Sequence, residues 1–212
     1  MNEHFLLDTN VVVDAVRYVV DPAVSKLRWK VSHDFLKKHC RDVNCFISDL
    51  TQYIELPRVL MKMFLSNNVR IEQPGSLLSI VRDWVNEWLS KLKINVISID
   101  VSDYEVALAL VRACQGSDST SPTGILEGAV NVILLATALS KGYSFVTTDE
   151  NLVCGLSGAV ISNFTITYTI EGLCKAEARL DVNNRRLNIS VYLISDKCRP
   201  GFKCWHGWCR TP

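Results

Sequence analysis

The first 150 residues alternate between short apolar runs of strand type and longer segments with helical periodicity. Apolar runs lie at 4–7, 43–47, 94–99 and 144–147, and the segments between them have helical character, most clearly at 76–92. Strands that alternate with helices in this way form a parallel sheet covered on both faces. The sequence therefore predicts an α/β fold, a three-layer α/β/α arrangement around a central parallel sheet.

The pattern changes near residue 165. Three segments, 164–170, 176–182 and 187–194, have the alternating character of successive strands, and Asn183-Asn184 is a candidate hairpin turn. We therefore expect two parts. An α/β domain would cover 1–165, and a small C-terminal antiparallel β extension with a cysteine-rich tail would cover 166–212.

The charge balance excludes some classes of protein. The 212 residues include 23 basic and 22 acidic side chains, which argues against a strongly basic, histone-like binder. The longest apolar run, 128–139, is too short to span a bilayer, and the first ten residues lack a secretory signal. The sequence thus predicts a soluble, cytoplasmic protein that makes no membrane contact.

The chain contains eight cysteines, which is unusual for a protein expected in a reducing cytosol. One explanation is disulfide bonding, which occurs in intracellular proteins of hyperthermophiles. A second is a zinc site in the tail formed by Cys198, Cys204, His206 and Cys209. Their spacing fits none of the common zinc patterns, so a disulfide-stapled tail is favoured over zinc. Free buried cysteines are a third reading.

Two carboxylates directly follow predicted strands. Asp8 ends the first strand and Asp149 the fourth, and functional groups gather at the carboxyl ends of parallel strands. Glu127 and Asn131 share one face of an apolar helix, where polar groups need partners. A hard divalent cation, Mg²⁺ or Mn²⁺, would offset the repulsion between such carboxylates. The alternative is that Asp8 and Asp149 are ordinary turn and cap residues.

Four segments in register resemble the PIN domain nucleases. They are Leu6-Leu7-Asp8-Thr9-Asn10-Val11, then 47–56, then 131–142, and finally Phe145-Val146-Thr147-Thr148-Asp149. The match covers about residues 3–163. The resemblance implies a PIN fold and a metal-dependent endoribonuclease. For small prokaryotic members it also implies the toxin half of a VapBC toxin–antitoxin pair.

The resemblance also assigns roles to single residues. It implies that Asp8, Glu55 and Asp149 are the catalytic residues and hold Mg²⁺ or Mn²⁺. Thr147 carries over as a supporting polar group, and Asn10 as a residue that holds the ligands in place.

One position departs from the family pattern. The family usually has aspartate where this chain has Asn131, which offers a carbonyl oxygen but no charge. Losing a unit charge beside a divalent ion costs on the order of a few kcal/mol at an effective dielectric near 20. Glu127, one turn earlier, or Glu150, next to Asp149, can supply the missing carboxylate. If neither does, the chain is a degenerate PIN-fold protein that binds RNA or a protein partner without cleavage.

Basic residues near the first two motifs are candidates for binding RNA phosphates. Lys30 belongs to a basic stretch at 26–41, while Arg58 and Lys62 lie one and two turns past Glu55. The alternative is a solvated helix face. The family resemblance also implies two protein partners, an antitoxin protein and a second copy of the chain forming a homodimer. A redox or zinc protein organised by the tail is a further functional hypothesis.

Overall fold

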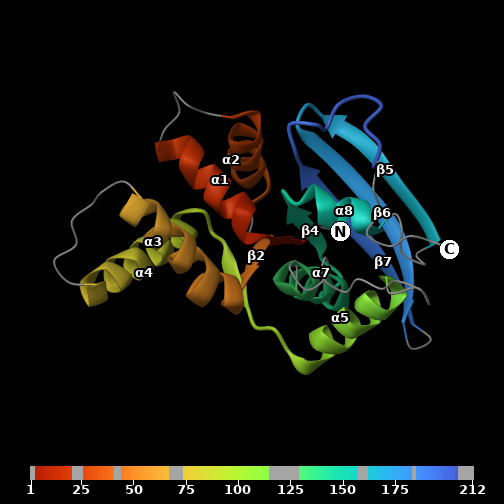
Figure 1. Cartoon of the computed structure of the whole chain (residues 1–212), viewed down its shortest axis with the longest axis horizontal. Helices are drawn as coiled ribbons and strands as arrows, with labels where there is room; N and C mark the ends of the chain where they lie inside the picture. The colour runs from red at the N-terminus through yellow and green to blue at the C-terminus, as the bar shows by residue number, and fades with distance from the viewer. Residues whose placement is uncertain are drawn as a thin grey trace.

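A single mixed sheet organises the described part of the chain. The computed structural model describes residues 3–20, 26–40, 44–66, 74–114, 129–156, 162–182 and 185–204. Within them, seven strands pair in the order β3-β2-β1-β4-β7-β6-β5 (Figure 1). Their bounds are β1 Phe5–Leu7, β2 Cys45–Ser48, β3 Asn95–Ile97, β4 Ser144–Thr147, β5 Ser162–Ile170, β6 Leu173–Val182 and β7 Arg185–Ile194.

Strand direction divides this sheet into two regions. Neighbours from β3 to β7 are parallel, whereas β6 and β5 add antiparallel pairs at one edge. β7 lies beside β4, with Phe145 opposite Val191 and Thr147 opposite Leu193. The chain therefore leaves β4, later forms the β5–β6 hairpin and returns to add its last strand in parallel. The predicted C-terminal strands are present, but they continue the main sheet. The proposed boundary near residue 165 stays a prediction.

Helices cover both faces of the parallel region, which confirms the predicted three-layer α/β/α architecture (Figure 1). α1, α2, α3 and α4 contribute to one apolar cluster, and α5, α7 and α8 to the other. Their bounds are α1 Thr9–Val20, α2 Leu27–His39, α3 Leu56–Ser66, α4 Pro74–Lys91, α5 Val101–Cys114, α7 Ala129–Lys141 and α8 Glu150–Leu156.

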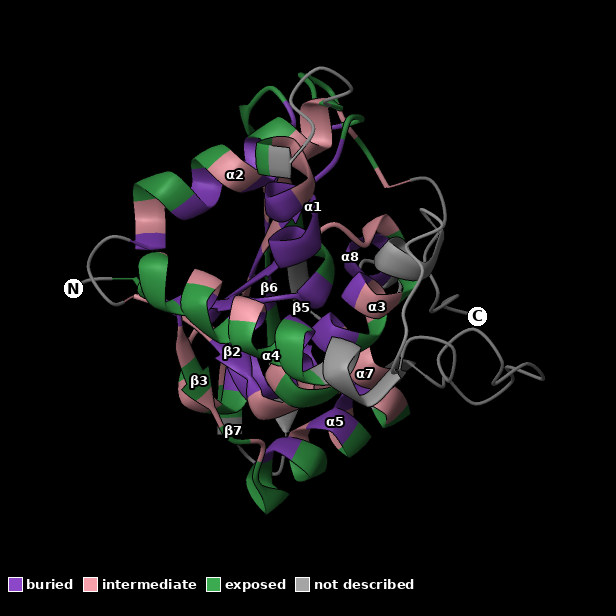
Figure 2. Ribbon diagram, turned by 90° about the vertical axis from the view of Figure 1, so that its left-hand side faces the viewer, coloured by how far each residue is buried: buried purple, intermediate pink, exposed green. Residues whose placement is uncertain are grey.

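Adjacent strand residues belong to opposite clusters. Leu6 packs with α5, α7 and α8, whereas Phe5 and Leu7 pack on the other face. The same switch separates Phe145 from Val146. Because successive side chains point to opposite faces, strands buried on both sides need continuous apolar runs. Figure 2 shows the resulting buried layer through the strands and the inner faces of the helices.

Local caps place the strand ends that carry the candidate site. Gly142 has φ of +69° and ends α7, as the sequence predicts. The N–H of Tyr143 donates to the carbonyl of Ala138 over 2.7 Å, so the chain turns directly into β4. At the start of α5, Asp100 is the cap, because its Oδ1 accepts the Ser102 N–H over 3.0 Å.

Three disulfides join cysteines of the described ranges: Cys40–Cys45, Cys154–Cys204 and Cys174–Cys198. Two of the four proposed zinc ligands, Cys198 and Cys204, are thus in separate disulfides. This favours disulfides over the zinc site; His206 and Cys209 lie outside the described residues. Within the same ranges, each helix is too short or too polar to cross a membrane.

Candidate active site

Asp8 is a buried carboxylate at the carboxyl edge of the parallel sheet. Its residue is only 1% exposed, and its Oδ2 accepts a hydrogen bond from Oγ1 of Thr147 over 2.8 Å. Burial raises the pKa of Asp8 to about 6, although the Thr147 bond lowers it. Repulsion from Glu55 and Asp149 raises this pKa further, so both carboxylates lie close enough to act on Asp8.

Thr147 connects the ends of β1 and β4. Besides donating to Asp8, its Oγ1 accepts the backbone N–H of Asp149 over 3.0 Å. The side chain is fully buried. A hydroxyl is one of the few groups that can both donate and accept in so small a space. Thr147 therefore fixes the position of Asp149 relative to Asp8.

Glu55 reaches the site from a π-helical segment, η3 Thr51–Glu55, which precedes α3. The sequence predicts one helix from Ser48 or Asp49 with Pro57 in its first turn or at a kink. In the structure, the π-helical segment η3 comes first, and Pro57 is the second residue of the α-helix α3 that follows it. The Leu56 N–H donates to the carbonyl of Thr51, five residues back. Such π segments are frequent at functional sites.

A set of hydroxyls holds Glu55 against the end of β1. The Thr9 hydroxyl donates a short hydrogen bond to Oε2 of Glu55 and lies 3.4 Å from Oγ1 of Thr51. Thr51 in turn lies 3.1 Å from the hydroxyl of Ser48. Sequence reasoning missed the roles of Thr9, Ser48 and Thr51. The available signal was the threonine directly after Asp8 and the Ser-x-x-Thr spacing that caps the helix after β2.

Asn131 brings α7 to the end of β4. Its Nδ2 donates to Oδ2 of Asp149 over 2.7 Å. The other oxygen of Asp149 accepts the backbone N–H groups of Asn151 and Leu152, over 2.9 Å and 3.1 Å, at the start of α8. Asp149 is therefore both a helix cap and a candidate ligand. The two readings left open by the sequence are compatible.

Other predicted site residues have different surroundings. Glu150 turns to the C-terminal segment, with one oxygen bonded by the Ser195 hydroxyl and the other 2.6 Å from Nζ of Lys197. The side chain of Asn10 is exposed, although its backbone N–H bonds to Asp8. Glu127 lies outside the described residues, so its predicted role as a ligand stays a prediction.

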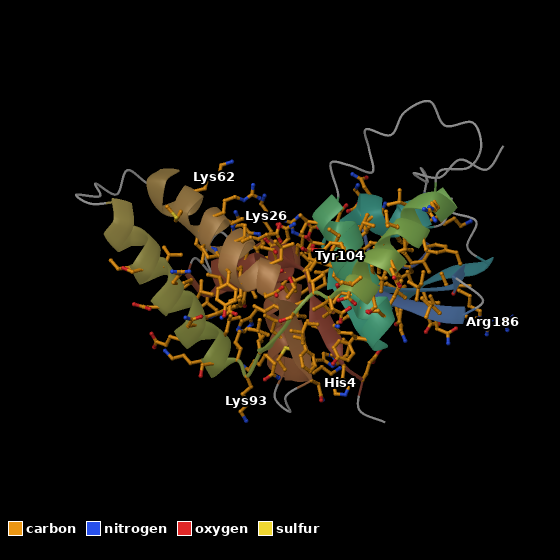
Figure 3. All side chains as sticks on the ribbon, turned by 90° about the horizontal axis from the view of Figure 1, so that it is seen from below. His4, Lys26, Lys62, Lys93, Tyr104 and Arg186 are labelled. Atoms are coloured by element: carbon orange, nitrogen blue, oxygen red, sulfur yellow. A yellow bond between two sulfur atoms is a disulfide. The ribbon has the colours of Figure 1, made fainter. Side chains whose placement is uncertain are left out.

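The basic residues proposed to bind RNA lie on the helices beside the site. Lys30 is exposed on α2, and Arg58 and Lys62 are exposed one turn apart on α3. Figure 3 shows Lys62 on α3, well separated from Arg186 on β7. Side chains four residues apart share one helix face. Arg58 and Lys62 thus form one basic face beyond Glu55, and their RNA contact stays a prediction.

The carboxylates do not form a ready-made ligand cluster. As the side chains stand, no three His, Cys, Asp or Glu residues of the described ranges could hold a metal ion. A cavity of about 570 Å³ lies elsewhere, on strands β5 to β7. It is lined by polar side chains that include Glu177, Arg179 and Asn188. The cavity is thus separate from the carboxylates. Asp8 and Asp149 lie just after β1 and β4, and Glu55 is the last residue of η3.

Comparison with known proteins yields a distant likeness among solved structures. No protein-family model and no curated protein matches the sequence. Among solved structures, a chain of a toxin–antitoxin complex from Klebsiella pneumoniae is similar, with a TM-score of 0.36 and 18% identity. The match covers 68% of this chain and 85% of that chain. A likeness this distant assigns neither a family nor an activity.

Proposed function

We propose that this protein is a metal-dependent endoribonuclease of PIN type, in which Asp8, Glu55 and Asp149 bind Mg²⁺ or Mn²⁺. One observation carries the proposal. Asp8 is 1% exposed and has a pKa raised to about 6, with Glu55 and Asp149 adding to the effect of burial. A buried carboxylate that two neighbouring carboxylates repel is costly unless a proton or a cation joins them. A ligand site gives a reason for retaining them.

The donor set suits a hard divalent cation. Three carboxylates and the carbonyl oxygen of Asn131 offer only oxygen, which Mg²⁺ and Mn²⁺ prefer. Each carboxylate already accepts a hydrogen bond from a side chain of the site, Thr147, Thr9 or Asn131. Metal sites commonly hold their ligands by such outer contacts. Since no three acidic side chains of the described ranges stand ready to hold an ion, side-chain rotation would have to accompany binding.

The chain's own groups have separate tasks in this proposal. When bound, the cation would supply positive charge beside a phosphate oxygen and lower the pKa of a water molecule. Thr147 keeps Asp8 oriented, and Thr9 keeps Glu55 against the same strand end. Asn131 donates a hydrogen bond from α7 to Asp149. Arg58 and Lys62 would hold the RNA through its phosphates.

Cleavage of RNA with Mg²⁺ or Mn²⁺ tests this function. We expect Asp8→Asn to lose activity, because the amide removes a charge from the centre of the ligand set. Asp103→Asn is the matched control, since Asp103 is equally buried but lies on α5 beside Ser140. Equal cleavage by wild type and Asp8→Asn would refute the proposal.

A catalytically degenerate protein that binds RNA or a protein partner without cutting is the second candidate. The Asn131–Asp149 hydrogen bond favours it, because the amide N–H stabilises the Asp149 carboxylate without a metal. RNA retention in a mobility-shift assay, without cleavage in Mg²⁺ or Mn²⁺, would support this reading. The toxin role implied by the resemblance predicts growth arrest on expression, relieved by a co-expressed antitoxin protein.

A further inference from the structure

The turn 195–198 lies next to the candidate site, although it comes near the end of the sequence. Ser195 directly follows β7, which runs parallel to β4. Thr147 lies opposite Leu193, so Asp149 and Ser195 both come two residues beyond paired positions. Parallel neighbours bring their carboxyl ends to one edge of the sheet.

Several contacts fix the turn within the fold. The backbone N–H of Ser195 donates to the carbonyl of Gly172, and the Gly172 N–H donates to the carbonyl of Cys198, both over 3.0 Å. Cys198 is also joined to β6 by its disulfide with Cys174. Asp196 accepts the Arg28 N–H at the start of α2 over 2.9 Å. The turn is therefore anchored to the β5–β6 hairpin and to α2.

From this anchored turn, two side chains hold Glu150. The Ser195 hydroxyl donates a short bond to Oε1, and Nζ of Lys197 lies 2.6 Å from Oε2. A second connection runs from α8 to the end of the described chain through the Cys154–Cys204 disulfide. Both oxygens of Glu150 are thus engaged away from Asp8. This arrangement disfavours Glu150 as a substitute ligand for the charge missing at Asn131.

We propose that Ser195 and Lys197 are positioning residues of the carboxylate site, acting through Glu150 on Asp149. Glu150 begins α8, and Asp149 caps that helix through the N–H groups of Asn151 and Leu152. Holding Glu150 therefore fixes the helix start on which the orientation of Asp149 depends. The inference rests on the proposed function, because the property that it sets is the affinity for a divalent cation.

Calorimetric titration of the oxidised full-length chain with Mn²⁺ tests the inference. Loss of an outer contact typically weakens metal binding 10–100-fold, so we expect roughly tenfold weaker binding in Ser195→Ala and in Lys197→Met. The conservative variants Ser195→Thr and Lys197→Arg should restore most of the affinity. Lys197 is 72% exposed at its side chain, so its replacement leaves the core intact.

Matched controls exist elsewhere in the chain. Lys91→Met removes an ion pair with Glu87 of the same 2.6 Å length and similar exposure, 70%. Ser140→Ala removes another serine that donates a short bond to a carboxylate, Asp103. Neither control should change Mn²⁺ affinity.

The outcomes separate the two proposals. If wild type binds Mn²⁺ and the two variants bind equally well, the positioning role is wrong and the proposed function stands. Tighter binding by Lys197→Met would also overturn it, because a released Glu150 would then be acting as a ligand. If wild type does not bind Mn²⁺, both proposals fail.

Discussion

The amide of Asn131 donates a hydrogen bond to Oδ2 of Asp149 over 2.7 Å. An aspartate at this position would bring a second carboxylate against the first, and the two would repel unless a proton or a cation came between them. The amide instead removes one charge and adds a donor. The Asn131–Asp149 pair is thus stable without a metal ion, but the site has one negatively charged ligand fewer than it would have with an aspartate at this position.

Asn131→Asp should therefore destabilise the metal-free protein. Two unit charges about 4 Å apart interact with about 4 kcal/mol at an effective dielectric of 20, so we expect a loss of about 2–4 kcal/mol at pH 7. Urea unfolding with and without Mn²⁺ measures this, and Mn²⁺ should recover much of the loss because it binds the folded state. Asn188→Asp, an exposed change of equal charge on β7, is the control. The same loss with and without Mn²⁺ would argue against a cation site.

Asp8 should make stability depend on pH. The pKa of Asp8 is raised from 3.8 to about 6, chiefly by burial. The folded state therefore binds the proton more tightly than the unfolded state. The associated stabilisation is complete below pH 4 and is lost as pH rises through 6. At about 1.4 kcal/mol per pH unit, this is about 3 kcal/mol. Unfolding of wild type and Asp8→Asn between pH 4 and 7 should diverge by that amount, and parallel curves would contradict the assignment.

Thr147→Val should cost stability in a pH-dependent manner. The valine removes the donor to Asp8 and the acceptor for the Asp149 N–H, while keeping the side-chain shape. A hydrogen bond to a charged group contributes about 1.5–3 kcal/mol. We expect a loss of that size, larger at pH 8 than at pH 4, because Asp8 is ionised only at the higher pH. Thr147→Ser, which keeps the hydroxyl, should retain most of the stability in the same denaturant series.

The disulfides should differ in how much they stabilise the fold. They close sequence separations of 5, 24 and 50 residues, for Cys40–Cys45, Cys174–Cys198 and Cys154–Cys204 respectively. Loop entropy then predicts about 2, 3.5 and 4 kcal/mol. Paired serine substitutions, compared by thermal unfolding under oxidising conditions, should reproduce that order. Reductant should destabilise wild type more than a variant that lacks these three bonds.

Two glycines with positive φ offer a matched comparison. Gly172 has φ of +81°, and an added Cβ would lie 2.8 Å from Cγ2 of Val31. Gly142 has φ of +69°, with nothing within 4 Å of the added atom. Gly142→Ala should therefore cost about 1 kcal/mol for backbone strain alone. Gly172→Ala should cost about 2–4 kcal/mol, because α2 must also move. Equal losses in chemical denaturation would rule out the close approach of α2.

Local patterns were sufficient to predict most elements of the parallel region. Short apolar runs identified β1, β2, β3 and β4, and helical spacing identified the helices between them. The placement of Asp8 and Asp149 at one sheet edge followed from the rule that parallel strands share direction. These features depend on residues close in sequence.

Which strands pair and which distant side chains meet depend on the whole fold and were harder to predict. The alternation in 187–194 indicated a strand but not that its neighbour is β4. The signal that was available is the unbroken apolar run Val191-Tyr192-Leu193-Ile194, which suits a strand covered on both faces. Likewise, nothing near Glu150 in the sequence indicates its contacts with Ser195 and Lys197. Such contacts arise only after distant segments have met.

The pairing of β4 with β7 also constrains how the molecule is made. β4 is paired on both sides only after β7 has been added, since Phe145 pairs with Val191. During translation, β4 therefore presents open backbone donors and acceptors until the residues of β7 have emerged. Unpaired strand edges of this kind attract other chains. Slow elongation or termination between β4 and β7 should thus favour aggregation over a smaller, independently folded product.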